Sequence, residues 1–168
     1  FPEITLTARK INERQPREIV NFILKKLSKK RKSKKIINIS ILGVAFKGFP
    51  ITDDLRGSMA LELVKSLKTK LIKAKIHAYD PIVEKSKILN QNLLSINSIE
   101  EAFKNKDLIV IANDNSFFSN LKLNQLSKFM KKESFIYDVW NLYDKKNLKL
   151  NNDVKYFSLG SQNIIENE

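Results

Sequence analysis

The sequence of 168 residues contains no cysteine, a single histidine and only four glycines. Without cysteine these residues form no disulfide, offer no thiolate nucleophile and build no Cys-based zinc site. His77 alone cannot supply a His-rich metal site. No apolar run approaches the roughly 20 residues that cross a membrane, and no signal-peptide pattern is visible. We therefore expect a cytoplasmic protein with no metal site in these residues.

The residues that are present favour one ordinary folded domain with an excess of positive charge. Apolar residues make up 42% of the sequence, which is enough for a core at this length. The net charge of +13 suits a polyanionic partner such as nucleic acid or an anionic nucleotide. However, 26 lysines stand against five arginines, and isoleucine and asparagine are abundant too. AT-rich codon usage produces that bias without a partner, and nucleic-acid readers rely more on arginine, so we favour the compositional explanation.

The first part of the chain predicts helix over residues 3–27. It carries two apolar stripes at helical spacing, which are Ile4, Ala8 and Ile11, and then Ile19, Val20, Ile23, Leu24 and Leu27. Pro16 between them would start a second helix or kink a single one. Both stripes need a packing partner, which we expect in missing sequence or in another subunit. Because the sequence opens on Phe-Pro-Glu without Met, we also expect a fragment of a longer protein.

A basic run, SKKRKSKK at 28–35, follows the helix. It is either an arm that contacts phosphates or a solvated linker, and we favour the linker because such runs are usually exposed. We therefore place a boundary here, with a helical segment and linker at 1–35 and an α/β domain at 36–168.

The rest of the chain alternates between strand and helix patterns. Strands are predicted at 36–42, 75–79, 108–112, 135–138 and 154–158, and helices at 58–73, 98–105 and 121–130. Ser58 and Ser98 are the expected N-caps. The stretch 82–97 is irregular with room for a short element near Leu93, and the tail after Gly160 is polar. This alternation predicts a doubly wound parallel sheet with right-handed crossovers.

The loop after the first strand is the best candidate for a site, because ligands bind at the carboxyl ends of strands in such sheets. Residues 41–58 read ILGVAFKGFPITDDLRGS, and neither GxGxxG nor a Walker loop can be drawn there. A phosphate would therefore need a side-chain cation, for which Lys47 is the obvious residue. Phe46 could stack on a base or lie under a sugar. The alternative is that Phe46 belongs to the core and Lys47 to the solvated surface.

Three carboxylates near this loop allow several interpretations. Asp53 and Asp54 could form a metal or acid/base pair, fix Arg56 for an anionic ligand, or favour the start of the next helix. We place the acid/base pair last, because adjacent carboxylates rarely point the same way. Asp80, at the end of the second strand, lies where dinucleotide-binding domains hold an acid for a ribose, but Pro81 follows it and we favour a turn residue. Trp140, after the fourth strand, could line the same crevice or close the core.

These residues together resemble the C-terminal domain of the UDP-glucose/GDP-mannose dehydrogenase family. The resemblance lies in LGVAFKGFPITDDLRGSMALELV at 42–64, AYDP at 78–81, DLIVIAND at 107–114 and FIYDVWNLYD at 135–144. ARKINERQPREIV at 8–20 is similar to the end of the family's central helical segment. The order FK, TDDxR and YDP on successive elements is the specific part of the match, which covers residues from about 3 to about 160.

The resemblance implies a Rossmann-like domain that binds the nucleotide of a UDP-sugar. Members oxidise the sugar to a UDP-uronic acid with NAD, which is held by an N-terminal domain, and they dimerise through the central helices. It also implies that Phe46 and Lys47 contact the sugar nucleotide and that Arg56 reaches NAD. The active-site cysteine lies upstream in the family, so we assign no catalytic residue here and expect this chain alone to be inactive.

Two features depart from the family's pattern. The turn FKGFPITDD is longer than the common FKPNTDD, and Trp140-Asn141 stands where some members place an arginine that contacts substrate. Two alternatives from other classes stay open. One is a basic α/β module that binds nucleic acid, and the other is a structural dimerisation module without catalysis.

Overall fold

The computed structural model describes residues 2–28, 36–151 and 153–160. Most of the basic run at 28–35 and the polar tail after Gly160 lie outside these residues, so the linker and tail assignments stay predictions.

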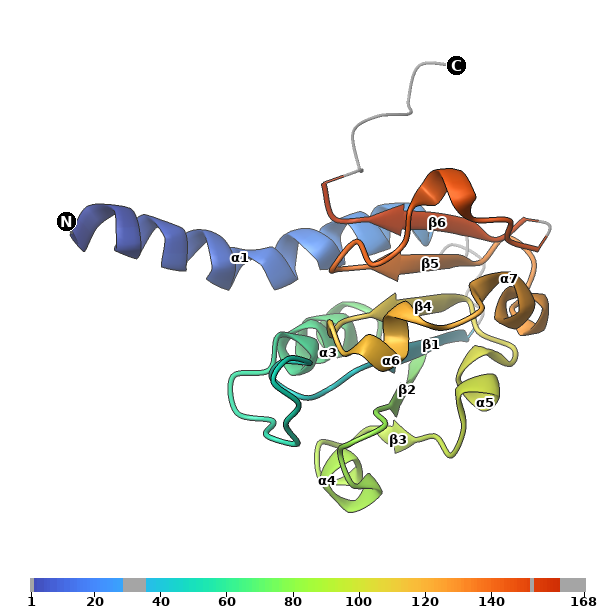
Figure 1. Cartoon of the computed structure of the whole chain (residues 1–168), viewed down its shortest axis with the longest axis horizontal. Helices are drawn as coiled ribbons and strands as arrows, with labels where there is room; N and C mark the ends of the chain where they lie inside the picture. Colours follow the sequence, from blue (N-terminus) through green and yellow to red (C-terminus); the bar gives the residue numbers. More distant parts are fainter. Residues whose placement is uncertain (1, 29–35, 152, 161–168) are drawn as a thin grey trace.

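A six-stranded sheet organises the fold (Figure 1). Its strands are β1 (Ile37–Leu42), β2 (Ala74–Tyr79), β3 (Leu94–Ser95), β4 (Leu108–Ile111), β5 (Phe135–Asp138) and β6 (Lys155–Ser158). The spatial order is β3-β2-β1-β4-β5-β6 and every pairing is parallel. This order reverses direction between β1 and β4, as in doubly wound dinucleotide-binding sheets. The predicted fold class is confirmed.

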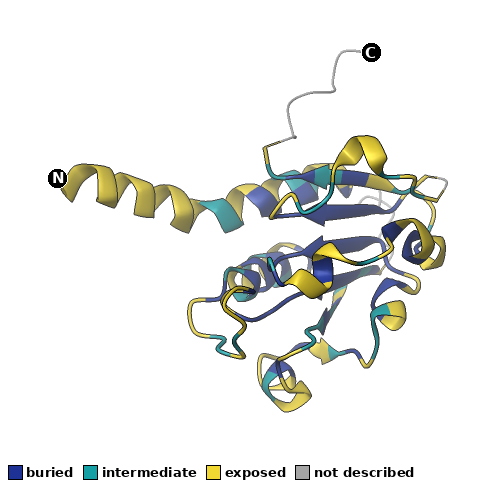
Figure 2. Ribbon diagram, in the orientation of Figure 1, coloured by how far each residue is buried: buried dark blue, intermediate teal, exposed yellow. Residues whose placement is uncertain are grey.

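The central strands are buried on both faces, which explains their continuous apolar runs. Because successive side chains in a strand point to opposite faces, Leu108 and Val110 belong to one core while Ile109 and Ile111 belong to the other. β5 divides in the same way, with Tyr137 in the first core and Ile136 in the second. Figure 2 shows these strands as the most buried part of the molecule.

Helices cover both faces of the sheet. The first face carries α1 (Pro2–Lys26), α3 (Met59–Lys70) and α4 (Lys85–Leu89), and the second carries α5 (Ile99–Phe103), α6 (Ser116–Ser119), α7 (Leu123–Leu126) and η1 (Ser127–Phe129). A further turn, η2 (Lys145–Asn147), precedes β6. The predicted caps are confirmed, because Ser58 and Ser98 accept hydrogen bonds from the main-chain N–H of Leu61 and Glu101. None of the described helices is long and apolar enough to cross a membrane.

The long helix α1 is one helix with Pro16 inside it, and its two halves have different surroundings. We expected both apolar stripes to pack outside the chain, and for the second stripe this was wrong. Ile19, Val20 and Ile23 are fully buried in the core that α1 shares with the sheet and α3. The first half extends past the sheet, and Ile4 is 76% exposed (Figures 1 and 2).

Two segments differ from the predicted elements. The helix expected over 121–130 is divided into α7 and η1, because the chain turns at Ser127, whose side chain is buried and accepts a hydrogen bond from the main-chain N–H of Asn151. The irregular stretch 82–97 contains α4 and the edge strand β3, which has only two residues. The short helix α6, directly after β4, was not predicted.

Candidate functional site

The loop that leaves β1 is held in place by residues at the ends of the neighbouring strands. Asp80 Oδ2, at the end of β2, accepts hydrogen bonds from the main-chain N–H of Val44 at 2.8 Å and of Ala45 at 3.2 Å. Its Oδ1 accepts from Ile82 and Val83 at 2.9 and 3.1 Å. Both oxygens of Asp80 are therefore engaged with main-chain donors. The interpretation of Asp80 as a turn residue is confirmed. Asp80 also connects the loop after β1 to the loop after β2.

On the other side, residues after β4 hold the same loop, and sequence reasoning missed them. Asn113 is buried and donates from Nδ2 to the carbonyl of Ala45 at 3.1 Å, while Asp114 Oδ1 accepts from the N–H of Gly48 at 2.7 Å. At Gly48 a Cβ atom would lie 2.0 Å from the backbone nitrogen of Asn115, so no larger residue fits. These residues could have been found from the sequence, because a run of polar residues directly follows a buried strand, the strand that pairs with β1.

The loop then closes on itself and delivers the chain into α3. The N–H of Phe46 donates to the carbonyl of Asp54 at 2.7 Å, and the buried hydroxyl of Ser58 donates to the carbonyl of Val44 at 2.7 Å. Ser58 therefore links the end of β1 to the start of α3 as well as capping that helix. With its main chain fixed at these points, the loop turns Phe46 and Lys47 outward, where both are exposed.

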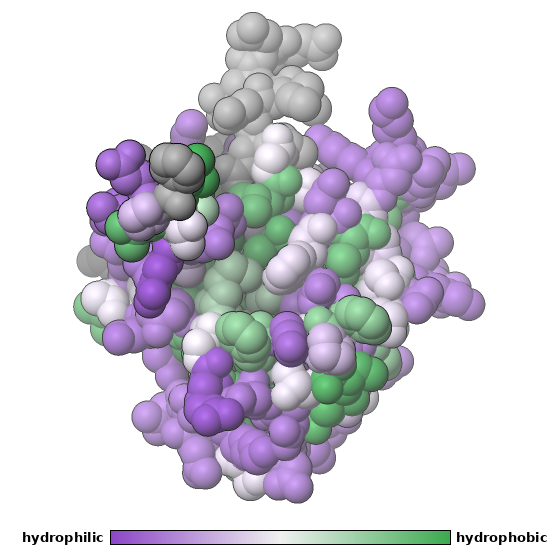
Figure 3. Space-filling view, turned by 60° about the vertical axis from the view of Figure 1, so that its left-hand side comes forward, coloured by the Kyte–Doolittle hydropathy of each residue, from purple (hydrophilic) through white to green (hydrophobic). Residues whose placement is uncertain are grey.

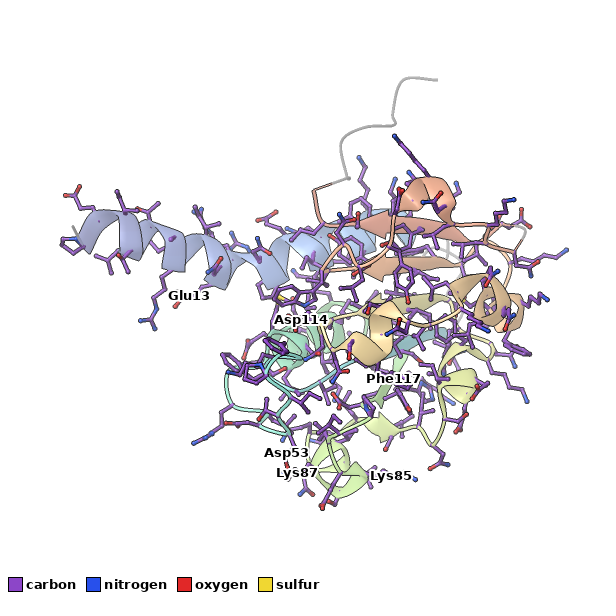
Figure 4. All side chains as sticks on the ribbon, viewed as in Figure 1. Glu13, Asp53, Lys85, Lys87, Asp114 and Phe117 are labelled. Carbon is purple, nitrogen blue, oxygen red and sulfur yellow. The ribbon has the colours of Figure 1, made fainter. Side chains whose placement is uncertain are left out.

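The two adjacent carboxylates of the loop point to different partners. Asp53 pairs with Lys87 of α4, and Figure 4 shows these two side chains next to each other. Asp54 accepts hydrogen bonds from the guanidinium of Arg56, at 2.7 Å from Nη2 and 3.0 Å from Nε, and from the main-chain N–H of Arg56 at 2.9 Å. The Arg56 hydrogen bonds lower the pKa of Asp54 to about 2, so it is ionised at neutral pH. The interpretation of Asp53 and Asp54 as an acid/base pair is therefore wrong. The structure shows instead the arrangement in which an aspartate, Asp54, fixes Arg56.

A groove of about 960 Å³ opens at the carboxyl edge of the sheet, between this loop, the end of β5, the start of α3 and the middle of α1. Its lining includes Phe46, Lys47, Gly57, Val139 and Trp140. The structure therefore brings two of the three predicted site residues into one groove, together with the tryptophan whose position was left open. Figure 3 shows this face of the molecule, where apolar side chains lie among hydrophilic ones.

Arg56 is not part of the lining. Its side chain is 92% exposed and lies beside Asp54, although the next residue, Gly57, does line the groove. The structure therefore places Arg56 next to the groove and facing solvent, where it is accessible to a group outside the described residues.

The middle of α1 supplies the opposite wall of the groove, with Asn12, Glu13, Gln15, Pro16 and Arg17. Sequence reasoning missed this wall because it looked for the partner of α1 outside the chain. Pro16 has no N–H, so the carbonyl of Asn12 lacks the usual intrahelical donor. The wall therefore offers hydrogen-bonding groups of both kinds, and Glu13 is partly neutralised by Arg9 at 2.8 Å.

The β5 end of the groove rests on a buried carboxylate. Asp138 Oδ1 accepts from the N–H of Trp140 at 2.9 Å, and Oδ2 accepts from the N–H of Leu142 and the hydroxyl of Tyr156, both at 2.6 Å. Burial raises the pKa of Asp138, and these hydrogen bonds oppose that shift. Trp140 itself is 48% exposed, so it does not close the core.

The described residues hold no group of three or more His, Cys, Asp or Glu side chains that could bind a metal ion. His77 lies within β2, and its Nδ1 is 3.3 Å from the carbonyl of Ile39. Burial lowers the pKa of His77, and its place in the strand, away from the groove lining, makes it a packed residue.

The fold and this groove define a doubly wound α/β domain with a groove at the carboxyl edge of its sheet, which is the edge where domains of this class bind ligands. The profile of the UDP-glucose/GDP-mannose dehydrogenase family, UDP binding domain, matches residues 40–145. The chain belongs to this family, as its motifs indicated.

Individual relatives agree with this assignment. A UDP-glucose 6-dehydrogenase from Rickettsia conorii is 35% identical over 156 residues, which are 91% of this chain and 34% of that protein. The structure of a UDP-D-ManNAc dehydrogenase from Pyrococcus horikoshii matches with a TM-score of 0.69 and 28% identity, over 89% of this chain and 32% of that one. An NDP-N-acetyl-D-galactosaminuronic acid dehydrogenase from Methanosarcina mazei gives a TM-score of 0.73 at 25% identity, over 92% and 31%. The chain spans about a third of the length of these relatives.

Proposed function

We propose that this chain is the C-terminal part of an NAD-dependent nucleotide-sugar dehydrogenase, and that it binds the nucleotide of a UDP-sugar. The substrate would be UDP-glucose or a UDP-N-acetylhexosamine, oxidised to the UDP-uronic acid for polysaccharide biosynthesis in the cytoplasm. The observation that carries the proposal is the groove at the carboxyl edge, which Phe46 and Lys47 line together. Membership of the family and the names of its relatives support it.

Lys47 is the proposed phosphate contact. It is exposed and forms no ion pair with another residue in the described part of the chain, so its ammonium is available to an anion. Arg17 adds a second cation to the lining, whereas Glu13 and Glu62 contribute negative charge. A diphosphate would therefore bind near Lys47 and Arg17, and Phe46 would provide an apolar contact beside it.

Arg56 is the proposed contact to NAD. In this proposal a separate N-terminal domain holds the cofactor, which supplies the hydride acceptor for both oxidation steps. Arg56 fits a role at such a boundary, because Asp54 orients its guanidinium while 92% of the side chain remains exposed. This chain has neither a cysteine nor the glycine fingerprint for a dinucleotide, so we expect no dehydrogenase activity from it alone.

Isothermal titration calorimetry of the 168-residue chain with UDP tests the nucleotide-binding proposal. We expect saturable heat, weakened roughly tenfold in Lys47→Ala because a charge-assisted hydrogen bond is lost. Lys75→Ala is the matched control, because Lys75 is an exposed lysine in β2 that is not part of the groove lining. The absence of saturable heat, or equal affinity in both variants, would contradict the proposal.

We further propose that the exposed half of α1 forms a homodimer contact. Ile4 and Ile11, seven residues apart and so on one face of the helix, are 76% and 49% exposed where α1 extends past the sheet. Exposed apolar side chains on one face favour an interface. Sedimentation equilibrium of the wild type and of a variant with Ile4→Lys and Ile11→Lys tests this. A monomeric wild type would overturn the dimer proposal, and the proposal of nucleotide binding would be unaffected.

A further inference from the structure

We propose that Trp140 is the stacking platform of the groove, against which one ring of the sugar nucleotide lies, and that it thereby selects ligands that carry such a ring. The inference rests on the proposed function, since it names a further binding residue of the same groove. It is carried by the way in which Trp140 is anchored, exposed and placed.

Trp140 is anchored at one edge of its indole and through its main chain. Its Nε1 donates to the carbonyl of Ala112, at the end of β4, at 3.1 Å. Its main-chain N–H donates to Asp138, whose carboxylate is held in turn by Tyr156. The ring therefore has a defined orientation before any ligand arrives. Little side-chain entropy is lost when such a prepositioned aromatic residue binds.

The anchored ring nevertheless remains half exposed. Both Val139 and Trp140 line the groove, but Val139 is 6% exposed and belongs to the core, whereas Trp140 is 48% exposed. A tryptophan that served only the core would bury its ring and satisfy its N–H at the same time. Here the polar edge is satisfied by Ala112 and the apolar surface is left open, which is the arrangement that a ring-shaped ligand needs.

The surroundings of Trp140 fit a ligand that has both a ring and an anionic group. Phe46, which is 52% exposed, and Lys47 reach the same groove from the loop after β1. β1 and β5 are two places apart in the sheet, which corresponds to about 10 Å between strand backbones. Side chains from both loops can therefore contact one small molecule. The shared chemistry is stacking on an aromatic face, offered either by the base or by the hexose.

The chain contains a single tryptophan beside four tyrosines, so emission excited at wavelengths that only indole absorbs reports on Trp140 alone. We would titrate the 168-residue chain with UDP, UDP-glucose and inorganic pyrophosphate. We expect a saturable change in emission with UDP if the base stacks, or with UDP-glucose only if the hexose does. Pyrophosphate should leave the emission unchanged, because it offers an anion and no ring.

Calorimetry of variants supplies the second readout. We expect Trp140→Ala to weaken binding of the responding ligand roughly 5- to 100-fold, as for the loss of one ring–aromatic stack. Trp140→Phe should recover most of the affinity, because it keeps an aromatic face. Phe129→Ala is the matched control, since Phe129 is 50% exposed and lies on η1, outside the groove lining.

The outcomes separate this inference from the function on which it rests. If calorimetry shows UDP or UDP-glucose binding while emission is unchanged and Trp140→Ala binds within about twofold of the wild type, Trp140 is not the platform, although the proposed function stands. If neither ligand gives heat or a change in emission, the proposed function fails and the platform fails with it.

Discussion

The carboxylate of Asp80, at the end of β2, accepts a hydrogen bond from the main-chain N–H of Val44, just after β1, at 2.8 Å. In a dinucleotide-binding domain an acid at this place is available to a ribose. Here its two oxygens receive four main-chain donors, so Asp80 shapes the loop that carries Phe46 and Lys47. In this chain the carboxylate at that position therefore serves the structure of the loop.

Replacement of Asp80 tests this relationship. Asp80→Ala leaves four main-chain N–H groups without their acceptor, and we expect it to lower the free energy of unfolding by about 2 kcal/mol or more. Asp144→Ala is the control, because Asp144 caps the exposed turn η2 and should cost about 1 kcal/mol or less. Urea unfolding measures both, and equal losses would contradict the role of Asp80.

Gly48 tests the close approach between the loops after β1 and β4. Gly48→Ala would place its Cβ atom 2.0 Å from the nitrogen of Asn115, so one of the loops must move, at about 1–3 kcal/mol. We expect lower thermal stability and weaker UDP binding together. Gly160→Ala is the control, because nothing lies within 4 Å of its Cβ position. Gly160→Ala should lower the stability by only about 1 kcal/mol, because alanine is disfavoured in the left-handed backbone conformation of Gly160. It should leave UDP binding intact.

Substitutions in the two halves of α1 should affect stability differently. Ile23 is fully buried in the core and Ile4 is 76% exposed. Ile23→Ala should therefore lower the free energy of unfolding by about 2–4 kcal/mol through lost contacts and a cavity. Ile4→Ala should change it by less than about 0.5 kcal/mol at a concentration where the chain is monomeric. A small effect at Ile23 would mean that the second half of α1 is not part of the domain.

The buried carboxyl group of Asp138 should make the free energy of unfolding depend on pH in a defined direction. Burial raises its pKa above the ordinary value of 3.8, so the folded chain binds this proton more tightly than the unfolded chain. The stability that Asp138 contributes is therefore present below 3.8 and is lost as pH rises through its folded pKa. The free energy of unfolding of the wild type, minus that of Asp138→Asn, should fall as pH rises from about 4 to 7. Urea unfolding at several pH values measures it, and a difference that grows with pH would contradict the shift.

Much of the fold was predictable because its signals are local. The continuous apolar runs at β1, β4 and β5, and the serines that cap α3 and α5, each depend on a few neighbouring residues. The elements that were missed are short. The five-residue helix α4 and the four-residue helix α6 have too few residues for a periodic pattern, whereas the short element expected near Leu93 is the strand β3. Ser127 divides a predicted helix through a contact with distant Asn151.

The candidate site was predictable in part for the same reason. Phe46 and Lys47 were found because both follow one buried strand and stand in a motif. The wall supplied by α1 could not be found, since its residues 12–17 precede Phe46 by 29 residues or more. The apolar stripe of α1 does not reveal which surface the helix covers. The partners of Asp53 and Asp54 were likewise undecided, because adjacent side chains can turn to opposite sides.

The amino-acid sequence was enough to identify the family, the parallel doubly wound sheet and the loop that carries Phe46, Lys47 and Arg56. Periodicity, helix caps and ordered motifs can be recognised in the chain without coordinates. How the stretch from Ile41 to Ser58 is held in place follows from tertiary contacts. Its main chain is fixed by the hydrogen bonds that Asp80 and Asp114 accept and that Asn113 donates. Packing of α1 against the sheet turns the exposed loop into one wall of a groove. These contacts join residues that are far apart in the chain, and such contacts depend on three-dimensional packing that no local pattern encodes.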